Sequence, residues 1–342
     1  MEFRAKEIRK QAKQNFEKTW RETAELLSKK GRKMKWKKKQ GKKHSVVETI
    51  LKFREVFLSF GFEERILPAI IPENEVYRQY GPEAPLILDR VYYLAGLSRE
   101  EIGISEEKKG KIRKIIEGFN QFSELKIFLR NYKKGKIEAD DFIEEMTKKL
   151  KISEGQASEV VEKVFPEFKE LKPEPTELTL RSHMTASWFP LLSNLQRHRK
   201  LPLKLFSIGS RFRREQRQDK NHLYESTSAS IVVMSREITL EDGVILTRNI
   251  LAKLGFPASR VVPKKTTSKY YTPGMDLEVY TEFKGKELEI ANLGFYSPVS
   301  LANYKIWYPV LNLGFGVERM AMILTGEKDI RNLVYGKHGR VA

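Results

Sequence analysis

The C-terminal half of the chain is a succession of short strand-like segments, and this order constrains the fold more than any other feature. Three of these segments precede one helical pattern at 239–254, namely LTLRSHM (178–184), LKLFSIGSRFRRE (203–215) and STSASIVVMS (226–235). DLEVYTEF and KELEIANLGFY follow, and LNLGFGVERMAMILTG (311–326) then runs from a glycine-rich strand into a helix. Adjacent strands of this kind pair antiparallel, so we predict an α+β fold with a largely antiparallel sheet flanked by helices.

The N-terminal part has a helical character. Apolar residues recur at helical spacing over residues 3–28, which predicts one amphipathic helix. A second helix is predicted within residues 44–62, with Ser45 as its N-cap, Glu48 in the capping-box position and Gly61 at its end.

Two further segments connect these helices to the strands. Residues 63–73 are strand-like, and Pro68 should place that strand at a sheet edge or bend it, because proline lacks a backbone donor. Residues 98–170 are rich in Glu, Lys and Ile at a helical period, which predicts a helical insertion. LKPEPTE (171–177) is predicted to be a linker.

Composition sets the class of protein. A chain of 342 residues is expected to form one large core with a second unit, and 40% hydrophobic with 32% charged residues is typical of a soluble globular protein. No apolar run approaches the roughly 18 to 20 residues of a membrane span, and the first residues do not resemble a secretory signal. We therefore expect a cytoplasmic protein. The absence of cysteine excludes disulfides, thiolate metal sites and a cysteine nucleophile.

Positive charge is concentrated at the N-terminus. The chain carries a net charge of +19, and residues 1–44 hold 17 Lys or Arg against 5 Glu, an excess of +12. The cationic arm at 29–43, with Trp36 among its lysines, could bind a nucleic acid and stack on an unpaired base. A solvated tail is the alternative.

A second cationic cluster precedes a run of hydroxyl residues. FRREQRQDKNHLYESTSAS (212–230) contains Arg213, Arg214, Arg217 and Lys220 and ends in serine and threonine. Guanidinium groups and hydroxyls both donate hydrogen bonds to phosphate oxygens, so this composition indicates a site for two phosphate-bearing groups.

The last strand and helix add a further cation. In GFGVER (314–319), two glycines let a ligand approach the backbone, and Arg319 on the first helical turn can meet phosphates or stack on a purine. Packing glycines beside a surface arginine are the alternative. The P-loop pattern, a strand-linked dinucleotide-binding fingerprint and His/Cys metal spacings are all absent from the sequence.

Taken together, these segments resemble a known family. FRREQ with its return strand, followed by GFGVER, resembles motifs 2 and 3 of the class II aminoacyl-tRNA synthetases, and the helix at 45–60 with the Pro68 strand resembles their motif 1. Within that class the chain is most similar to the O-phosphoseryl-tRNA synthetase family, related to phenylalanyl-tRNA synthetases. The blocks that carry this similarity include LTLRSHMTASWF, STSASIVV and LEIANLGFYSPVSLANYKIWYPVLNLGFGVERMAMIL.

The resemblance implies a division of the chain. It places a basic N-terminal helix and arm at 1–44, motif 1 and the start of the catalytic core at 45–97, the helical insertion at 98–170, and the core with motifs 2 and 3 at 171–342. It also implies a homodimer through motif 1, or a tetramer.

The resemblance further implies roles for single residues in ATP binding. Arg213 would hold the α-phosphate, Glu215 would contact the adenine side or the tRNA end, and His222 and Arg319 would take the β- and γ-phosphates. Glu278 and Glu289, on adjacent strands, would bind Mg²⁺. Outward-facing strand carboxylates are the alternative for this pair.

The same resemblance implies a pocket for the amino acid. Its residues would be His183, Met184, Thr185, Ser228, Ser230 and Asn312. Hydroxyl and amide groups suit a phosphate dianion, whereas a phenylalanine pocket would be apolar. Ser228 and Ser230 must share one face of a regular strand.

The chain departs from the family pattern at two places. Ser226 stands where motif 2 usually carries a ring that stacks on adenine, which should weaken ATP binding by about 1 to 3 kcal/mol. The sequence stops at Ala342, where family members continue into an anticodon-binding extension, so we expect a short form that is either a natural paralogue or a catalytic fragment.

Three functions follow from this resemblance. The first is ATP-dependent activation of O-phosphoserine and its transfer to the 3′ end of tRNA(Cys). The second is activation of phosphoserine or a related amino acid for a different acceptor. The third is a non-catalytic protein that binds an amino acid or RNA. The presence of Arg213, Glu215, Glu278, Glu289 and Arg319 favours an enzyme.

Overall fold

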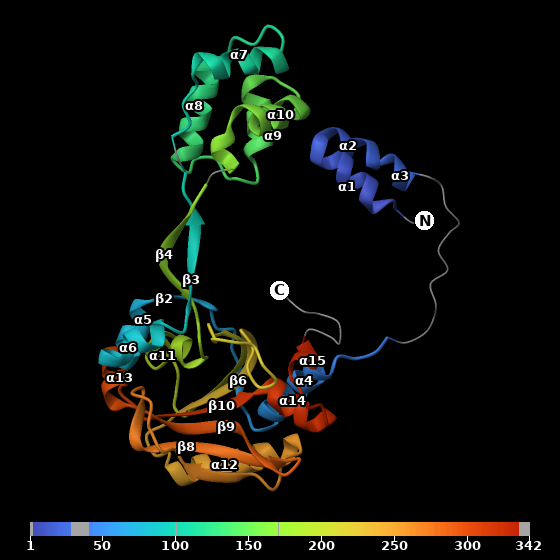
Figure 1. Ribbon diagram of the computed structural model, residues 1–342. Helices are drawn as coiled ribbons and strands as arrows, with labels where there is room; N and C mark the ends of the chain where they lie inside the picture. Colours follow the sequence, from blue (N-terminus) through green and yellow to red (C-terminus); the bar gives the residue numbers. More distant parts are fainter. Residues whose placement is uncertain (1–2, 29–40, 100, 170, 335–342) are drawn as a thin grey trace. The chain divides into compact units, whose positions relative to one another are not determined.

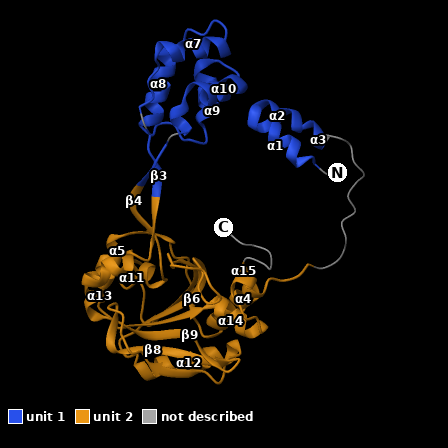
Figure 2. Ribbon diagram, in the orientation of Figure 1, with its two compact units in different colours: residues 1–39, 95–174 blue, residues 40–94, 175–342 orange. Residues whose placement is uncertain are grey.

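The computed structural model describes residues 3–28, 41–99, 101–169 and 171–334 (Figure 1). Most of the predicted cationic arm at 29–43, including Trp36, lies outside these residues. The chain divides into two compact units, coloured separately in Figure 2: unit 1 comprises 1–39 and 95–174, and unit 2 comprises 40–94 and 175–342. No helix among the described residues has the length and apolar character needed to cross a membrane.

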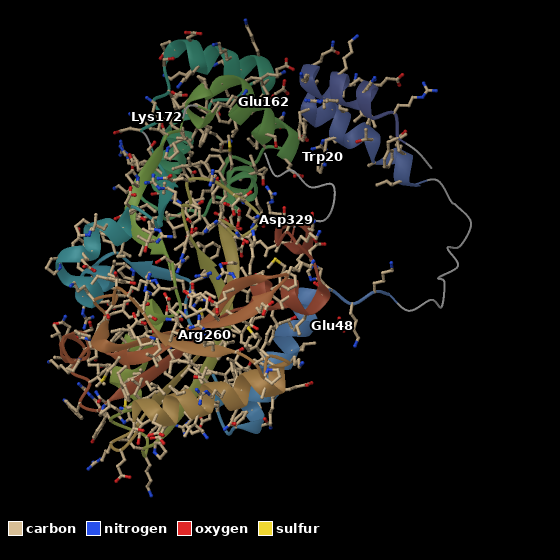
Figure 3. The ribbon with its side chains drawn as sticks, turned by 60° about the horizontal axis from the view of Figure 1, so that its bottom comes forward. Trp20, Glu48, Glu162, Lys172, Arg260 and Asp329 are labelled. Carbon is tan, nitrogen blue, oxygen red and sulfur yellow. The ribbon has the colours of Figure 1, made fainter. Side chains whose placement is uncertain are left out.

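The single helix predicted for residues 3–28 is wrong. The segment forms α1 (Ala5–Gln14), α2 (Phe16–Thr23) and α3 (Glu25–Ser28). Asn15 breaks the pattern because its backbone is extended and its side chain accepts the backbone N–H of Lys18 at 3.0 Å, which makes it the N-cap of α2. Trp20, labelled in Figure 3, is 56% exposed rather than buried on an apolar face.

The helices predicted within 98–170 are present in unit 1. They are α7 (Glu106–Ile115), α8 (Phe122–Lys133), α9 (Phe142–Leu150), α10 (Glu154–Val164) and the 3₁₀ turn η2 (Pro166–Lys169). Ser153 and Gln156 form a capping box at the start of α10. The helices pack around a separate apolar core that includes Leu125, Phe128 and Met146.

Unit 2 is built on a seven-stranded sheet in the order β1-β5-β6-β10-β9-β8-β7. Its strands are β1 (Glu63–Glu64), β5 (Leu203–Phe212), β6 (Glu225–Met234), β7 (Arg260–Pro263), β8 (Tyr271–Phe283), β9 (Lys286–Tyr296) and β10 (Val310–Gly316). Only the pair of β1 with β5 is parallel among these strands, so the predicted α+β fold with a largely antiparallel sheet is confirmed.

A smaller sheet has the order β2-β4-β3. Its strands are β2 (Ile70–Pro72), β3 (Tyr92–Leu97) and β4 (Pro173–Leu180). The linker predicted at 171–177 is therefore wrong, because most of it belongs to β4. The strand predicted at 63–73 is divided at Pro68 into β1 and β2, which lie in different sheets.

Helices cover both faces of the large sheet (Figure 1). The helices of unit 2 are α4 (Ser45–Ser59), α5 (Asn74–Tyr80), η1 (Gly81–Glu83), α6 (Ala84–Leu88), α11 (Thr185–Leu195), α12 (Leu240–Leu254), α13 (Pro298–Asn303), α14 (Val317–Thr325) and α15 (Arg331–Val334). α4, α12 and α14 pack on one face, and α11 packs on the other.

The predicted capping box of α4 is not formed. The N-cap is His44, without a side-chain hydrogen bond, and Ser45 is the first helical residue. The carboxylate of Glu48 lies 3.5 Å from the Lys43 ammonium instead of reaching back to the backbone.

Candidate active site

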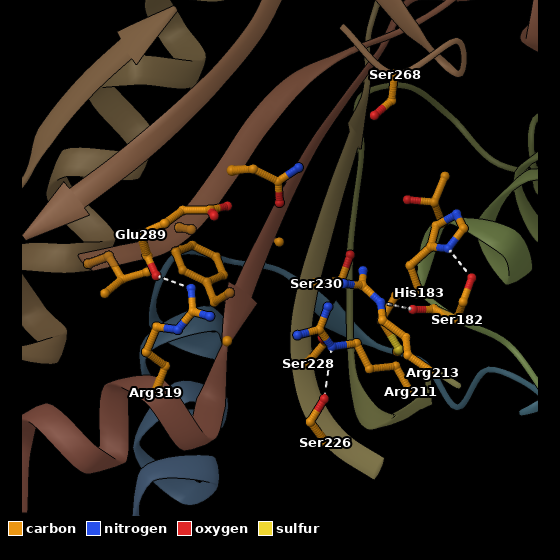
Figure 4. Close-up of a pocket in the computed structure, with 18 of the residues that line it drawn as sticks. Ser182, His183, Arg211, Arg213, Ser226, Ser228, Ser230, Ser268, Glu289 and Arg319 are labelled. Atoms are coloured by element: carbon orange, nitrogen blue, oxygen red, sulfur yellow. Dashed lines mark hydrogen bonds between the residues drawn. The ribbon is translucent and has the colours of Figure 1, made fainter. Parts of the chain in front are cut away.

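A cavity of about 470 Å³ opens in unit 2 on the sheet face covered by α11, and Figure 4 shows its centre. The structure brings every site residue predicted from the sequence to this one cavity. These are His183, Met184, Thr185, Arg213, Glu215, His222, Ser228, Ser230, Glu278, Glu289, Asn312 and Arg319.

The serines of β6 reach the cavity because a strand alternates its side chains between two faces. Ala229 and Ile231 point into the core beneath α4 and α12. Ser228 and Ser230 point the other way and line the cavity, as predicted for residues two apart. Further along the strand the same face is apolar and packs against α11, so the polar wall is confined to one end of β6.

Ser230 is held by two donors. Its Oγ atom accepts a hydrogen bond from Trp188 Nε1 at 3.0 Å and one from Asn312 Nδ2 at 3.1 Å. A hydroxyl that accepts twice still has its own hydrogen to donate. The two neighbours therefore leave Ser230 as a hydrogen-bond donor within the cavity wall.

Asn312 lies beneath the cavity in a network of side chains. Its Oδ1 atom accepts from the Tyr271 hydroxyl at 2.7 Å, and that hydroxyl also accepts from Asn292 Nδ2 at 3.1 Å. Gly314, beside this network, has no room for a side chain, because a Cβ there would lie 2.7 Å from Asn292 Oδ1. Asn292 was not singled out from the sequence, since only the pairing of β9 with β10 brings it here.

Two arginines at the end of β5 line the cavity. Arg211 and Arg213 are two residues apart, and Arg213 Nε donates to the backbone oxygen of Ser182 at 3.1 Å (Figure 4). The nearby Arg213 cation, together with burial, lowers the pKa of Arg211 to about 9. Burial and Arg90 also lower the pKa of Arg213. This concentration of positive charge is suited to an anion.

Arg211 and Arg90 were missed by the sequence reasoning. Arg211 could have been found, because it lies two residues before Arg213 in the strand-like segment predicted at 203–215. Arg90 precedes β3, and no local pattern links it to the site; its guanidinium donates to Glu215 Oε1 at 3.2 Å. Arg214, which lay in the cationic cluster, instead points to Asp89 at 2.7 Å and is not part of the lining.

The opposite wall is formed by β9, β10 and α14. Arg319 Nη1 donates to the backbone oxygen of Glu289 at 2.6 Å, which holds the guanidinium at the cavity edge (Figure 4). Its neighbour Glu318 was not predicted to be part of the site. The buried Glu318 carboxylate accepts the backbone N–H of Thr227 at 2.6 Å, and burial raises its pKa.

The N-terminus of α11 also faces the cavity. His183, Met184 and Thr185 line the cavity, and the N-cap Met184 makes no side-chain capping bond. The first backbone N–H groups of a helix have no partner within it and favour an anion. The Thr185 hydroxyl accepts a hydrogen bond from Tyr296 at 3.4 Å.

His183 is fixed by both ring nitrogens. Nε2 lies 2.7 Å from the Tyr80 hydroxyl, and Nδ1 lies 2.8 Å from Ser182 Oγ. Burial and the nearby arginines lower the pKa of His183 to about 3, so the ring is neutral near pH 7. The ring stacks on Tyr270 with centroids 5.4 Å apart.

Two carboxylates could hold a metal ion. Glu278 and Glu289 lie on the paired strands β8 and β9 and both line the cavity. Lys264 Nζ lies 3.9 Å from Glu278 Oε1, and the Tyr280 hydroxyl donates to Glu278 Oε2 at 2.8 Å. Within the described residues, His, Cys, Asp and Glu form no group of three or more that could hold an ion. The pair therefore suits Mg²⁺ that is bound jointly by protein carboxylates and substrate phosphates.

His222 and Ser226 also line the cavity. His222 Nδ1 lies 2.8 Å from Asp219 Oδ1, and the same oxygen accepts the His222 backbone N–H at 3.0 Å. Ser226 is on β6, on the same face as Ser228 and Ser230, and no aromatic side chain stands at its position.

Sequence comparison identifies similar proteins. The chain is 46% identical to the O-phosphoserine--tRNA(Cys) ligase of Methanocaldococcus jannaschii and 44% identical to that of Methanopyrus kandleri. The matches cover 98% and 96% of this chain. The chain spans 64% of the length of each of these relatives.

Comparison of the fold gives a more distant relation. The pyrrolysyl-tRNA synthetase of Desulfitobacterium hafniense superposes with a TM-score of 0.52 at 17% identity, covering 85% of this chain and 73% of that one. Residues 101–341 match the family described as tRNA synthetases class II core domain (F). The antiparallel pair of β5 and β6 and the glycine-rich end of β10 before α14 agree with this family match. The chain belongs to the class II tRNA synthetase core-domain family.

Proposed function

We propose that the chain activates O-phosphoserine with ATP to form phosphoseryl-adenylate and transfers the phosphoseryl group to the 3′ end of tRNA(Cys). The observation that carries this proposal is the presence of two different anion-binding groups in one cavity. One is the guanidinium cluster of Arg90, Arg211 and Arg213, and the other is the hydroxyl-lined end near Ser228 and Ser230. The names of the relatives from Methanocaldococcus jannaschii and Methanopyrus kandleri support the same substrate and acceptor.

The hydroxyl-lined end suits the phosphate of the amino acid. Ser230 retains a hydrogen to donate, and the N-terminal backbone N–H groups of α11 and the hydroxyls of Thr185 and Ser228 can add further donors. Met184 and the Asn312 amide support this wall, Asn312 through its bond to Ser230. Neutral donors with a helix N-terminus can bind a dianion without a buried lysine.

The arginine-lined part suits ATP. Arg213 would hold the α-phosphate, while Arg319 and His222 would take the β- and γ-phosphates and Glu215, fixed by Arg90, would face the adenine side or the tRNA end. The amino-acid carboxylate would then attack the α-phosphorus, which forms the mixed anhydride and breaks the bond to the leaving pyrophosphate. Positioning and cations suffice for this step, and it needs no protein nucleophile.

The second step would use the same cavity. The hydroxyl at the tRNA 3′ end would attack the carbonyl carbon of the adenylate, so that an ester forms and AMP leaves with its phosphate oxygens beside Arg213. Class II synthetases generally use ATP with Mg²⁺, and Glu278 and Glu289 would hold Mg²⁺, which offsets phosphate charge when bound.

The proposal extends to the assembly and its location. The exposed side chains of α4, which are Val47, Leu51 and Leu58, support a homodimer through this helix. Charging of tRNA(Cys) for protein synthesis would take place in the cytoplasm.

ATP–pyrophosphate exchange tests the proposal. Exchange is measured with phosphoserine, serine, phenylalanine and aspartate, and acylation is then measured with a tRNA(Cys) transcript. Exchange with phosphoserine alone together with acylated tRNA is expected. Exchange without acylation would contradict the proposed acceptor, and the absence of both would contradict the enzyme function.

A further inference from the structure

The helix α8 of unit 1 carries an exposed face of cations. Within α8, Lys126 and Arg130 are one helical turn apart, and Lys134 at the C-cap continues the row. All three side chains are exposed, whereas Leu125, Phe128 and Leu129 on the other side of α8 are buried in the core of the unit. Residues 125–137 contain five Lys or Arg and no Asp or Glu.

Three other helices of the unit, α7, α9 and α10, pair lysines with their own glutamates. Lys111 lies 2.6 Å from Glu107 in α7, and Lys148 lies 2.5 Å from Glu144 in α9. In α10, Lys163 pairs with Glu159. These pairs, each four residues apart, stabilise a helix by roughly 0.2 to 0.5 kcal/mol each.

Within the described residues, the cations on α8 form no ion pair with a glutamate of their own helix. No ion pair with a described residue is present for Lys126, Arg130, Lys134 or Lys136. Lys133, at the edge of the row, lies 3.4 Å from Glu101. Cations four residues apart repel one another, so the row lowers the stability of α8.

The helix dipole does not explain the whole row. Cations in the last turn of a helix are favourable near its partial negative charge, which accounts for Lys133 and Lys134. Lys126 is in the middle of α8, however, and Lys136 follows its end. A function in binding an extended anion accounts for all of them.

We infer that this α8 face, defined as Lys126, Arg130, Lys133, Lys134 and Lys136, binds the sugar-phosphate backbone of RNA. The inference rests on the proposed function in one respect, since that function supplies tRNA as the RNA. A row of cations with one exposed apolar neighbour, Ile127, suits a polyanion better than a protein partner, because protein interfaces are depleted of lysine and depend on buried aromatic or apolar anchors.

The test removes three cations of the row in the full chain. The variant Lys126→Ala/Arg130→Ala/Lys134→Ala is compared with the control Lys148→Ala/Lys149→Ala/Lys163→Ala, which removes the same charge from the same unit at lysines that are paired with glutamates. The dissociation constant for a tRNA(Cys) transcript is measured over a salt series, and circular dichroism checks that both variants are folded.

The row variant is expected to bind the transcript about tenfold or more weakly near 0.1 M salt, with a salt slope that is shallower by about two. The control is expected to stay within about twofold of the unchanged chain. A second variant, Lys126→Arg/Lys134→Arg, retains the charge and should bind like the unchanged chain.

Four results would contradict the inference. The row variant could bind the transcript with the affinity and salt slope of the unchanged chain, or the control could lose as much affinity as the row variant. The unchanged chain could fail to bind the transcript, or polyglutamate could compete for the row as strongly as RNA does.

Phosphoserine-dependent ATP–pyrophosphate exchange separates the RNA-binding inference from the proposed function. The row variant should exchange at the normal rate, and loss of exchange in the unchanged chain would contradict the proposed function alone.

Discussion

Arg211 Nε donates a 3.0 Å hydrogen bond to Ser226 Oγ, its cross-strand neighbour on β6. The resemblance to motif 2 leads one to expect an aromatic ring at position 226. The hydroxyl that stands there instead fixes a guanidinium whose pKa is lowered to about 9, mainly by Arg213. At position 226 a serine hydroxyl therefore holds the Arg211 cation, whereas the family pattern has an aromatic ring that stacks on adenine.

Replacing Ser226 with alanine should weaken ATP binding. The Arg211 guanidinium would lose a hydrogen bond, which is worth about 1 kcal/mol and corresponds to a roughly fivefold rise in the KM for ATP. The measurement is the ATP dependence of pyrophosphate exchange with phosphoserine.

The control for this change is Ser226→Thr, which keeps the hydroxyl. It should retain most of the affinity for ATP. An unchanged KM in Ser226→Ala would show that the bond does not orient Arg211 for nucleotide binding.

Arg213→Ala should abolish exchange, whereas Arg214→Ala should leave it nearly unchanged. The two residues are adjacent, but Arg213 lines the cavity and Arg214 pairs with Asp89 outside it. Removal of one preorganised charge from a reacting phosphate typically costs about a hundredfold or more in rate. Equal rates for the two variants would contradict the placement of ATP beside Arg213.

Local sequence patterns predicted the main strands, and the resemblance to the synthetase family supplied most of the residues that gather in the cavity. Strand alternation put Ser228 with Ser230, and the glycine-rich end of β10 put Arg319 on the next helix. Both features depend on neighbours in the chain, which a sequence displays directly.

Two of the missed residues depend on tertiary pairing. Asn292 reaches the site only through the register of β9 with β10, and Arg90 reaches it through its bond to Glu215. The failure at 3–28 had a local cause, because Asn15 competes for the backbone N–H of Lys18 in the middle of an otherwise helical pattern.

Gly314→Ala should destabilise the protein, and Gly316→Ala should not do so to the same extent. A Cβ at position 314 would lie 2.7 Å from Asn292 Oδ1, while the nearest atom to a Cβ at position 316 is Arg319 Cβ at 3.8 Å. Overpacking of a filled site costs about 1 to 3 kcal/mol, and alanine at an N-cap position such as 316 costs about 1 kcal/mol or less.

The measurement for the two glycine variants is thermal unfolding of each beside the unchanged chain. Equal melting temperatures for both would show that Asn292 can move away without cost. A larger loss in Gly316→Ala would contradict the tight packing at Gly314.

Stability should fall in acid partly because of His183. Its pKa is about 3 in the folded chain against 6.5 for an unperturbed histidine, so between these values the unfolded chain binds a proton that the folded chain does not. The His183 contribution to stability is therefore fully present above pH 6.5 and is lost as the pH falls toward 3, by at most about 1.4 kcal/mol per pH unit.

The variant His183→Asn isolates this contribution, because it keeps a polar side chain that does not titrate. Denaturant unfolding is measured for both proteins from pH 7.5 down to pH 4.5. The difference in unfolding free energy between the two should be constant above pH 6.5 and should shrink below it, since only the unchanged chain has the histidine proton to gain on unfolding. Curves that stay parallel over the whole range would mean that the ring takes up a proton in the folded chain as readily as in the unfolded one, despite Arg211 and Arg213 beside it.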